Sequence, residues 1–367
     1  MSKTQIDPCV PGRACCVMPI RPAVFVAQAL CFAALSLGCH STHSGKLRAM
    51  SGDSVVLVGD APSFLCHVPA AGCAVRVRNT YLPGLTNTID YVEGRDYLLD
   101  RATGTIRRGP ESRIPDFGTN ILYGREQFDH SKFPGYGNTA FFAFIDYSFR
   151  KNAVWPVEPR QAEFLSSTRR KLARGGKVKI VAYGDSITAG GEATRPDLIF
   201  WRRWAEELRR KYPRAKITDI NGATGGDTTA QGLQRLQTKV LDEKPDLVLI
   251  AFGMNDHNIG SVPVPRFESN LTEMISRIRA STSAEIILLS AFPPNPKWKF
   301  GSHHMEDYAV ATARVARQNK CAYADVYDNW VSLAERKKPE DLLGNNINHP
   351  NDFGHWIYLR ALEELGL

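Results

Sequence analysis

The sequence lacks a hydrophobic run long enough to form a membrane-spanning helix. Its most apolar stretch covers residues 23–37, whereas a spanning helix needs about 20 residues. The sequence also lacks a glycine-rich phosphate loop, and its paired histidines have no third ligand at a spacing that a metal site would use. These absences exclude a polytopic membrane protein, and we expect neither a metal nor a cofactor.

The excess of one charge over the other is small. The chain has 46 Lys and Arg residues against 38 Asp and Glu residues, with 43% hydrophobic and 23% charged residues. These fractions are typical of globular proteins and exclude the disordered, collagen-like and disulfide-scaffold classes. Basic clusters such as Arg209-Arg210-Lys211 are more typical of solvated helix faces than of a nucleic-acid surface. We therefore expect no nucleic-acid partner.

The N-terminal segment has the pattern of an export signal. Arg21 precedes the apolar stretch, which ends at Gly38-Cys39 before a polar run. A small residue directly before a cysteine resembles the lipobox of bacterial lipoproteins, in which the cysteine carries a lipid anchor. We predict that residues 1–39 are a signal peptide or lipoprotein signal, with Met18 as a second candidate start. The mature protein would then be periplasmic, extracellular or anchored to a membrane through Cys39.

Two cysteines downstream of this leader stand close together in the sequence. Cys66 and Cys73 bracket a short segment and could close a disulfide loop in an oxidising compartment. Two ordinary buried thiols are the alternative. The sequence alone leaves both interpretations open.

Residues 46–150 have the pattern of a small β-rich domain. Short β-rich runs cover residues 54–58, 74–79, 97–99, 105–107 and 140–149, and turn residues separate them. Residues 98–106 predict a hairpin in which Gly104 supplies a positive φ near the end of the turn. The pattern predicts an antiparallel, β-sandwich-like accessory domain.

A linker is predicted for residues 151–176, and a second domain for residues 177–367. Apolar strands are predicted at residues 179–183, 216–220, 247–252, 286–291 and 322–326. Helical stretches lie between them at residues 198–211, 231–241, 267–279 and 305–319. Alternating strands and helices predict a parallel five-stranded sheet in a three-layer α/β/α, flavodoxin-like arrangement. In such sheets, ligands bind beyond the carboxyl ends of the strands.

Polar motifs follow the predicted strands at that edge of the sheet. Gly184-Asp185-Ser186 ends the first strand of the second domain, and Gly226 lies after the next strand. Asn255 follows the third strand, and His349 stands near the C-terminus. The four motifs therefore converge on one rim of the predicted domain.

These motifs, in this order, resemble the four blocks of the SGNH/GDSL hydrolase family. The resemblance covers residues 177–367 and implies a serine esterase. It implies that Ser186 is the nucleophile and that His349 is the base. It also implies that Ser186, Gly226 and Asn255 form the oxyanion hole.

The chemistry of these side chains supports the same roles. A serine hydroxyl becomes a good nucleophile only when a base takes its proton, and a neutral histidine suits that task near pH 7. Attack on an ester carbonyl creates an oxyanion, which backbone N–H groups and a side-chain amide stabilise when they are fixed in advance. Each residue taken singly also has a structural explanation as a helix cap or turn residue. The presence of all four residues at one rim, in this order, favours the catalytic interpretation over the structural one.

Asn346 departs from the family pattern. The family usually places an aspartate three residues before the histidine, where it holds the imidazole and stabilises its charged form. An amide at this position can hold the ring but brings no charge. The alternatives are a Ser–His dyad with Asn346 as a neutral orienter, a substitute carboxylate such as Asp352, or a weakened enzyme. We favour the dyad, because some two-domain carbohydrate esterases of this family, with a β-sandwich before the hydrolase domain, work without the acid.

The loop at residues 293–304 is long and contains aromatic and histidine side chains. We expect Trp298, His303 and His304 to line the substrate pocket. A surface loop ordered by its prolines is the alternative.

The predicted function is that of an exported serine esterase that removes short acyl groups, most plausibly acetyl, from carbohydrate. Its partner is then a small-molecule or glycan ester, and the substrate class rests on the family resemblance. An O-acyltransferase, a lipolytic esterase and a non-catalytic glycan-binding protein are the alternatives.

Overall fold

The computed structural model describes residues 46–150 and 161–367. The predicted leader at residues 1–39, including Cys39, lies outside the described residues. Residues 44–367 form one compact unit. Within the described part of the chain, every helix is too short or too polar to cross a membrane.

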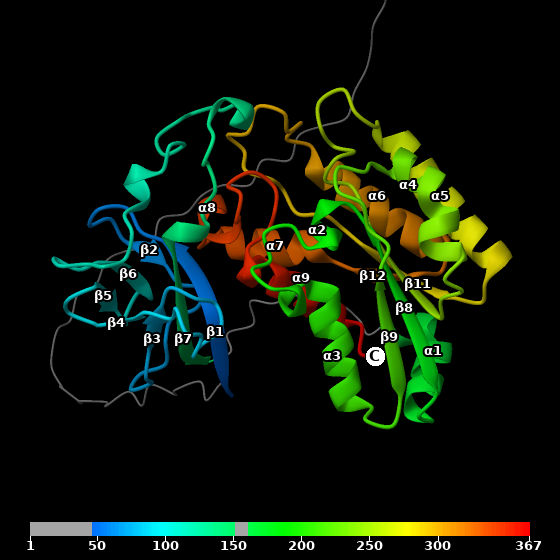
Figure 1. Cartoon of the computed structure of the whole chain (residues 1–367), viewed down its shortest axis with the longest axis horizontal. Helices are drawn as coiled ribbons and strands as arrows, with labels where there is room; N and C mark the ends of the chain where they lie inside the picture. Colours follow the sequence, from blue (N-terminus) through cyan, green and yellow to red (C-terminus); the bar gives the residue numbers. More distant parts are fainter. Residues whose placement is uncertain (1–45, 151–160) are drawn as a thin grey trace, which may run out of the picture. The chain divides into compact units, whose positions relative to one another are not determined.

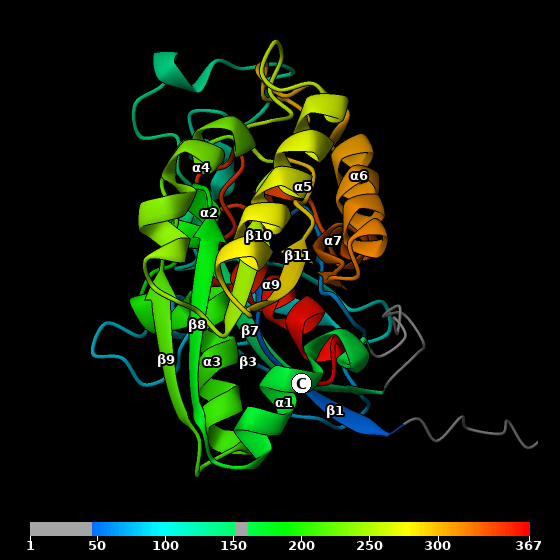
Figure 2. The ribbon, with the colours of Figure 1, turned by 90° about the vertical axis from the view of Figure 1, so that its right-hand side faces the viewer.

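A five-stranded parallel sheet forms the centre of the second half of the chain, as predicted. Its strand order is β12 (Ala322–Ala324), β11 (Glu285–Leu289), β10 (Leu247–Ala251), β8 (Lys177–Gly184) and β9 (Lys216–Asn221). Figure 2 shows β8 to β11 side by side. All residues of β10 are buried, as expected for a strand that is covered on both faces. The order is that of the doubly wound, flavodoxin-like class, whose ligands bind at the carboxyl edge.

Helices cover both faces of this sheet. Helices α3 (Phe200–Lys211) and α9 (Asp352–Glu364) lie on one side, and α4 (Thr229–Leu236), α5 (Val264–Ser281) and α6 (Met305–Gln318) lie on the other (Figure 1). Helix α5 buries Phe267, Leu271, Met274 and Ile278, the spacing of one apolar helix face. Further helices of this half include α2 (Ser186–Ala189), α7 (Val326–Ala334) and α8 (Pro339–Leu342). The result is the three-layer α/β/α fold of the SGNH hydrolases.

The first half of the described chain contains two antiparallel sheets, as predicted. One has the order β1 (Leu47–Val56), β7 (Phe142–Arg150), β3 (Arg76–Arg78) and β4 (Asp90–Tyr91). The other has the order β2 (Ser63–Phe64), β6 (Thr105–Arg108) and β5 (Tyr97–Asp100). The predicted hairpin joins β5 to β6, with Gly104 at φ 68°.

A helix lies where the sequence predicted a linker. Helix α1 (Ser166–Ala173) occupies part of residues 151–176 and packs against β8. Backbone N–H groups of Ser167 and Thr168 donate to the Glu285 carboxylate at 2.8 Å each. The prediction missed α1 because its polar, arginine-rich sequence has only a short apolar face.

Cys66 and Cys73 are free thiols in the structure. Sγ of Cys66 lies 3.3 Å from Asp53 Oδ1, and Sγ of Cys73 lies 3.4 Å from Ser148 O. The sequence left open a disulfide or two separate thiols, and the structure contains two separate thiols.

Candidate active site

Ser186 lies at the carboxyl edge of the sheet, directly after β8, where it begins the short helix α2. The preceding residue, Asp185, caps this helix, because its carboxylate accepts from the backbone N–H of Ile187 at 3.0 Å. Burial raises the pKa of Asp185 to about 7. Asp185 therefore shapes the turn that presents Ser186.

Ser186 and His349 meet across 163 positions of sequence. The distance from Ser186 Oγ to His349 Nε2 is 2.8 Å, within reach for proton transfer. Burial lowers the pKa of His349 to about 4, so the imidazole is neutral near pH 7. A neutral Nε2 can accept the serine proton, and the pair has the geometry of an activated nucleophile.

The three residues predicted to form the oxyanion hole follow β8, β9 and β10 at the carboxyl edge of the sheet. Gly226 has φ 79°, a conformation that glycine adopts without strain. Within the described residues, the backbone N–H groups of Ser186 and Gly226 have no protein acceptor. Asn255 Nδ2 donates one hydrogen to Asp227 O at 3.0 Å, which leaves its second hydrogen free. The three predicted oxyanion-hole residues therefore all offer an unused donor.

Asp256 ties two of the motifs together. It follows Asn255, and its carboxylate accepts from the backbone N–H of Thr229 at 2.9 Å and from the Thr229 hydroxyl. Burial raises the pKa of Asp256 to about 6. Since Thr229 begins α4 just after Gly226, this contact sets the distance between two of the oxyanion donors.

Asn345 shapes the loop that carries His349. Its Oδ1 accepts from the backbone N–H groups of Ile347, Asn348 and His349 at 3.0, 3.0 and 2.9 Å. Sequence reasoning missed this residue. An asparagine a few residues before a functional histidine is a signal for such a turn.

The β-rich region holds the same loop from outside. Buried Asn138 donates from Nδ2 to Leu343 O at 2.9 Å and to Glu340 O at 3.2 Å. Its backbone N–H donates to Gly344 O at 2.7 Å. The accessory region therefore contributes directly to the position of the catalytic loop.

Asn346 does not contact the imidazole as the sequence predicted. Its backbone oxygen and its Oδ1 accept from Asn295 Nδ2 at 3.0 and 3.2 Å, and its φ of 59° is left-handed. This backbone conformation directs the amide to Asn295. We therefore correct its predicted role from orienter of His349 to a link between two loops.

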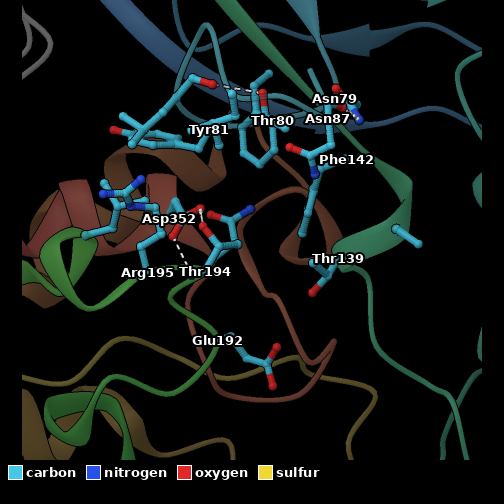
Figure 3. A pocket seen from close by; sticks show the side chains of 16 residues that line it. Asn79, Thr80, Tyr81, Asn87, Thr139, Phe142, Glu192, Thr194, Arg195 and Asp352 are labelled. Atoms are coloured by element: carbon cyan, nitrogen blue, oxygen red, sulfur yellow. Dashed lines mark hydrogen bonds between the residues drawn. The ribbon is translucent and has the colours of Figure 1, made fainter. Parts of the chain in front are cut away.

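Asp352 is not a substitute acid. Its carboxylate accepts from the Thr194 backbone N–H at 2.9 Å and from the Thr194 hydroxyl at 2.6 Å (Figure 3). Both oxygens are thus engaged at the start of α9.

A glycine backbone occupies the place next to His349 Nδ1. A Cβ atom on Gly191 would lie 2.9 Å from that nitrogen, closer than a Cβ atom approaches another heavy atom. Within the described part of the chain, His349 Nδ1 has no hydrogen-bond partner. The structure therefore has a Ser–His pair without an acid.

Of the three predicted pocket residues in the 293–304 loop, one is buried and two are exposed. Trp298 is 5% exposed and packs with Phe128 and Ile347, and its Nε1 donates to His130 Nδ1 at 3.1 Å. The prediction that Trp298 lines the substrate pocket is wrong, because apolar neighbours from the β-rich region bury the indole. His303 and His304 are exposed, and His304 lies 3.7 Å from Asp307.

A cavity of about 350 Å³ lies beside the loop that contacts His349. Glu192 lies at one end, and Asn79 and Asn87 lie at the other (Figure 3). Its volume is in the range of small-ligand sites. Sequence reasoning missed it because its walls come from four separate stretches of the sequence, at residues 79–87, 139–144, 192–198 and 351–352.

A Ser–His pair at the carboxyl edge of the sheet, with unused donors after the neighbouring strands, is typical of serine hydrolases with an α/β/α fold. Residues 182–357 match the family model of the GDSL-like Lipase/Acylhydrolase family. The chain belongs to this family and is a carboxylic ester hydrolase by class.

Three similar proteins are an arylesterase, an uncharacterized lipoprotein and an acetylxylan esterase. An arylesterase of Vibrio mimicus is 27% identical over 51% of this chain and 88% of its own length. An uncharacterized lipoprotein of Bacillus subtilis is 32% identical over 44% of this chain and 74% of its own length. The crystal structure of an acetylxylan esterase from Geobacillus stearothermophilus is similar over 52% of this chain and 94% of its own, with 23% identity and a TM-score of 0.45.

Proposed function

We propose that the protein is an exported serine esterase that hydrolyses short-chain acyl esters, chiefly acetyl esters of carbohydrate. The observation that carries the proposal is the 2.8 Å contact between Ser186 Oγ and neutral His349 Nε2 beside unused oxyanion donors. A protein that only binds glycan would not need this geometry.

The reaction follows from the geometry in two stages. Nε2 of His349 takes the hydroxyl proton of Ser186 as Oγ attacks the ester carbonyl carbon. The oxyanion receives hydrogen bonds from the Ser186 and Gly226 N–H groups and from Asn255 Nδ2, each donor being worth about 3 kcal/mol of barrier. The intermediate collapses when His349 returns the proton to the leaving alcohol, and Ser186 then carries the acyl group. Water then attacks the acyl carbon while Nε2 of His349 takes a proton from it. The second tetrahedral intermediate collapses by breaking the bond between the acyl carbon and Ser186 Oγ, His349 returns the proton to Oγ, and the carboxylic acid leaves.

The carbohydrate part of the proposal has separate support. The cavity beside Glu192 presents amide, hydroxyl and carboxylate groups from Asn87, Thr139 and Glu192, which suit the hydroxyls of a sugar. A relative named acetylxylan esterase matches over 95% of its own length. The leader at residues 1–39 and the lipoprotein relative support export.

Turnover of a chromogenic acetate ester tests the proposal. We expect hydrolysis by the wild type and a loss of at least about 10³-fold in Ser186→Ala and in His349→Ala. Equal rates in all three proteins would show that the site is not an esterase.

The carbohydrate and export steps need their own measurements. Release of acetate from acetylated oligosaccharides, followed by mass spectrometry, tests the substrate class, and no release would restrict the enzyme to other esters. Fractionation of expressing cells tests export, which is wrong if the protein stays in the cytoplasm with an intact N-terminus.

A further inference from the structure

A second histidine, His355, lies close to the catalytic pair and takes no part in the steps above. It belongs to α9 and is 0% exposed, and its ring stacks on Phe200 with the centroids 6.0 Å apart. Burial lowers the pKa of His355 to about 3. The imidazole is therefore neutral and carries a proton on one nitrogen only.

A hydrogen bond shows which nitrogen holds that proton. Nε2 of His355 lies 3.2 Å from Gly191 O. A carbonyl oxygen can only accept, so Nε2 must donate. Within the described residues, Nδ1 has no hydrogen-bond partner. The contact with Gly191 is thus the one polar contact that the structure records for this buried ring.

The carbonyl that His355 holds belongs to the residue against the catalytic imidazole. The missing side chain of Gly191 leaves room for His349 Nδ1. Gly191 N donates to Ser186 O at 2.8 Å, and the next residue, Glu192, has φ 62°. The backbone of Gly191 is therefore held by hydrogen bonds at both its N–H and its C=O, and the bond to the C=O comes from His355.

We propose that His355 is a positioning residue for the reaction. Its Nε2–H holds the Gly191 peptide against His349 and so keeps the imidazole turned toward Ser186, in a chain whose Asn346 cannot supply the acid of the family pattern. His355 touches neither substrate nor Ser186. The proposal rests on the proposed esterase function, because it concerns the base of that reaction.

The test compares two substitutions in the full chain with a chromogenic acetate ester. His355→Leu removes the donor, whereas His355→Gln keeps an N–H at nearly the same place. We expect His355→Leu to lower kcat by about 10²-fold with little change in KM, since small misplacements of a catalytic group cost this much. His355→Gln should restore most of the rate. If His355→Leu does not fold, His355→Asn replaces it, because its shorter side chain does not reach Gly191 O.

A matched control separates positioning from general damage. Thr312→Val also removes a buried hydrogen bond to a carbonyl, the one to Tyr308 O in α6. It should lower the thermal midpoint but leave kcat unchanged. Equal losses of kcat in Thr312→Val and His355→Leu would overturn the proposal, and so would a folded His355→Gln as slow as His355→Leu.

A double mutant tests the route through Gly191. In a Gly191→Ala background, His355→Leu should cost little more, because both changes act on one contact. If the fold-losses of kcat in the two single variants multiply in the double mutant, the proposal is overturned. Loss of turnover in Ser186→Ala tests the esterase function without reference to His355. A failure of the proposed role of His355 can therefore be distinguished from a failure of the proposed esterase function.

Discussion

At the scale of single residues, the catalytic base has no charged partner. Burial is the cause that lowers the pKa of His349, and a carboxylate beside the ring would raise it instead. The amide of Asn346 is engaged with Asn295, and Asp352 with Thr194. The imidazole therefore stays neutral, and active as a base, at a lower pH than an ordinary histidine.

The pH dependence of kcat/KM should show this directly. Protonation of His349 stops the reaction, so the acid limb should lie near pH 4 and well below the ordinary histidine value of about 6.5. Asn346→Asp should leave the limb in place, because position 346 faces Asn295. A limb at or above pH 6.5 would mean that an acid assists His349. Circular dichroism at each pH separates loss of activity from unfolding.

Gly191 should be intolerant of any side chain. Gly191→Ala places a Cβ 2.9 Å from His349 Nδ1, and we expect kcat to fall by about 10²-fold because the imidazole must move. Gly137→Ala is a matched control, since its Cβ would meet nothing closer than 3.6 Å. Steady-state kinetics that show equal rates for Gly191→Ala and the wild type would contradict this role of the backbone.

The sequence indicates the proposed catalytic residues more readily than the residues that support them. Ser186, Gly226 and Asn255 stand in short motifs after strands, and His349 stands in a short motif near the C-terminus, so local pattern is enough to propose them. Asn345 carries a turn signal in its residue type, whereas Asn138 contacts backbone groups that lie far away in the sequence. Trp298 was misassigned because a tryptophan in a loop looks the same in the sequence whether it faces a pocket or packs on distant residues.

At the scale of elements, the loop with His349 depends on the β-rich region. Asn138, just before β7, supplies hydrogen bonds to the carbonyls of Glu340 and Leu343. The amide of Asn351 donates to Ser54 Oγ in β1 at 3.1 Å. The region that the sequence predicts to be an accessory domain therefore helps to hold the loop that carries His349.

Removing the Asn138 side chain should weaken both stability and catalysis. Asn138→Ala leaves buried carbonyls unpaired, and we expect a loss of about 1–3 kcal/mol in the free energy of unfolding with a lower kcat. Asn319→Ala removes a similar amide-to-carbonyl bond, to Val315 O at 2.9 Å in α6, and should leave kcat unchanged. Denaturant unfolding and steady-state kinetics of the two variants, Asn138→Ala and Asn319→Ala, check this prediction. A wild-type kcat in Asn138→Ala would show that the loop does not need this support.

Strands were easier to predict than connections. The parallel strands are short apolar runs, and alternation with helices determines their arrangement. Helix α1 was missed because it is short and carries Arg169, Arg170 and Lys171. The hydrogen bonds between the β-rich region and the loop that carries His349 connect residues far apart in the sequence, so a local sequence pattern cannot predict them.

At the scale of the whole molecule, a buried ion pair joins the two halves of the described chain. Lys337 Nζ lies 2.9 Å from Asp53 Oδ1, and both side chains are 0% exposed. Asp53 also accepts from Tyr147 OH at 2.8 Å and from the Cys66 backbone N–H at 2.7 Å. Since residues 44–367 form one compact unit, we expect this part of the protein to unfold in one transition.

Breaking this pair should destabilise the whole unit. Lys337→Met leaves the Asp53 charge buried without its partner, which costs about 3–5 kcal/mol, and thermal unfolding should remain a single transition at lower temperature. Lys297→Met is the control, because Lys297 pairs with Glu340 at the surface and such pairs contribute about 0–1 kcal/mol. Two separate transitions in calorimetry would show that the halves fold independently.

The most direct test of the account is to find the acyl group on the enzyme. Rapid quenching during turnover of an acetate ester, followed by peptide mass spectrometry, should show one acetyl group on the peptide that contains Ser186. Ser186→Ala should show none, and His349→Ala should not accumulate it at a comparable rate. An acetyl group on another residue, or turnover without any acyl-enzyme in the wild type under conditions that trap it, would contradict the central role of Ser186.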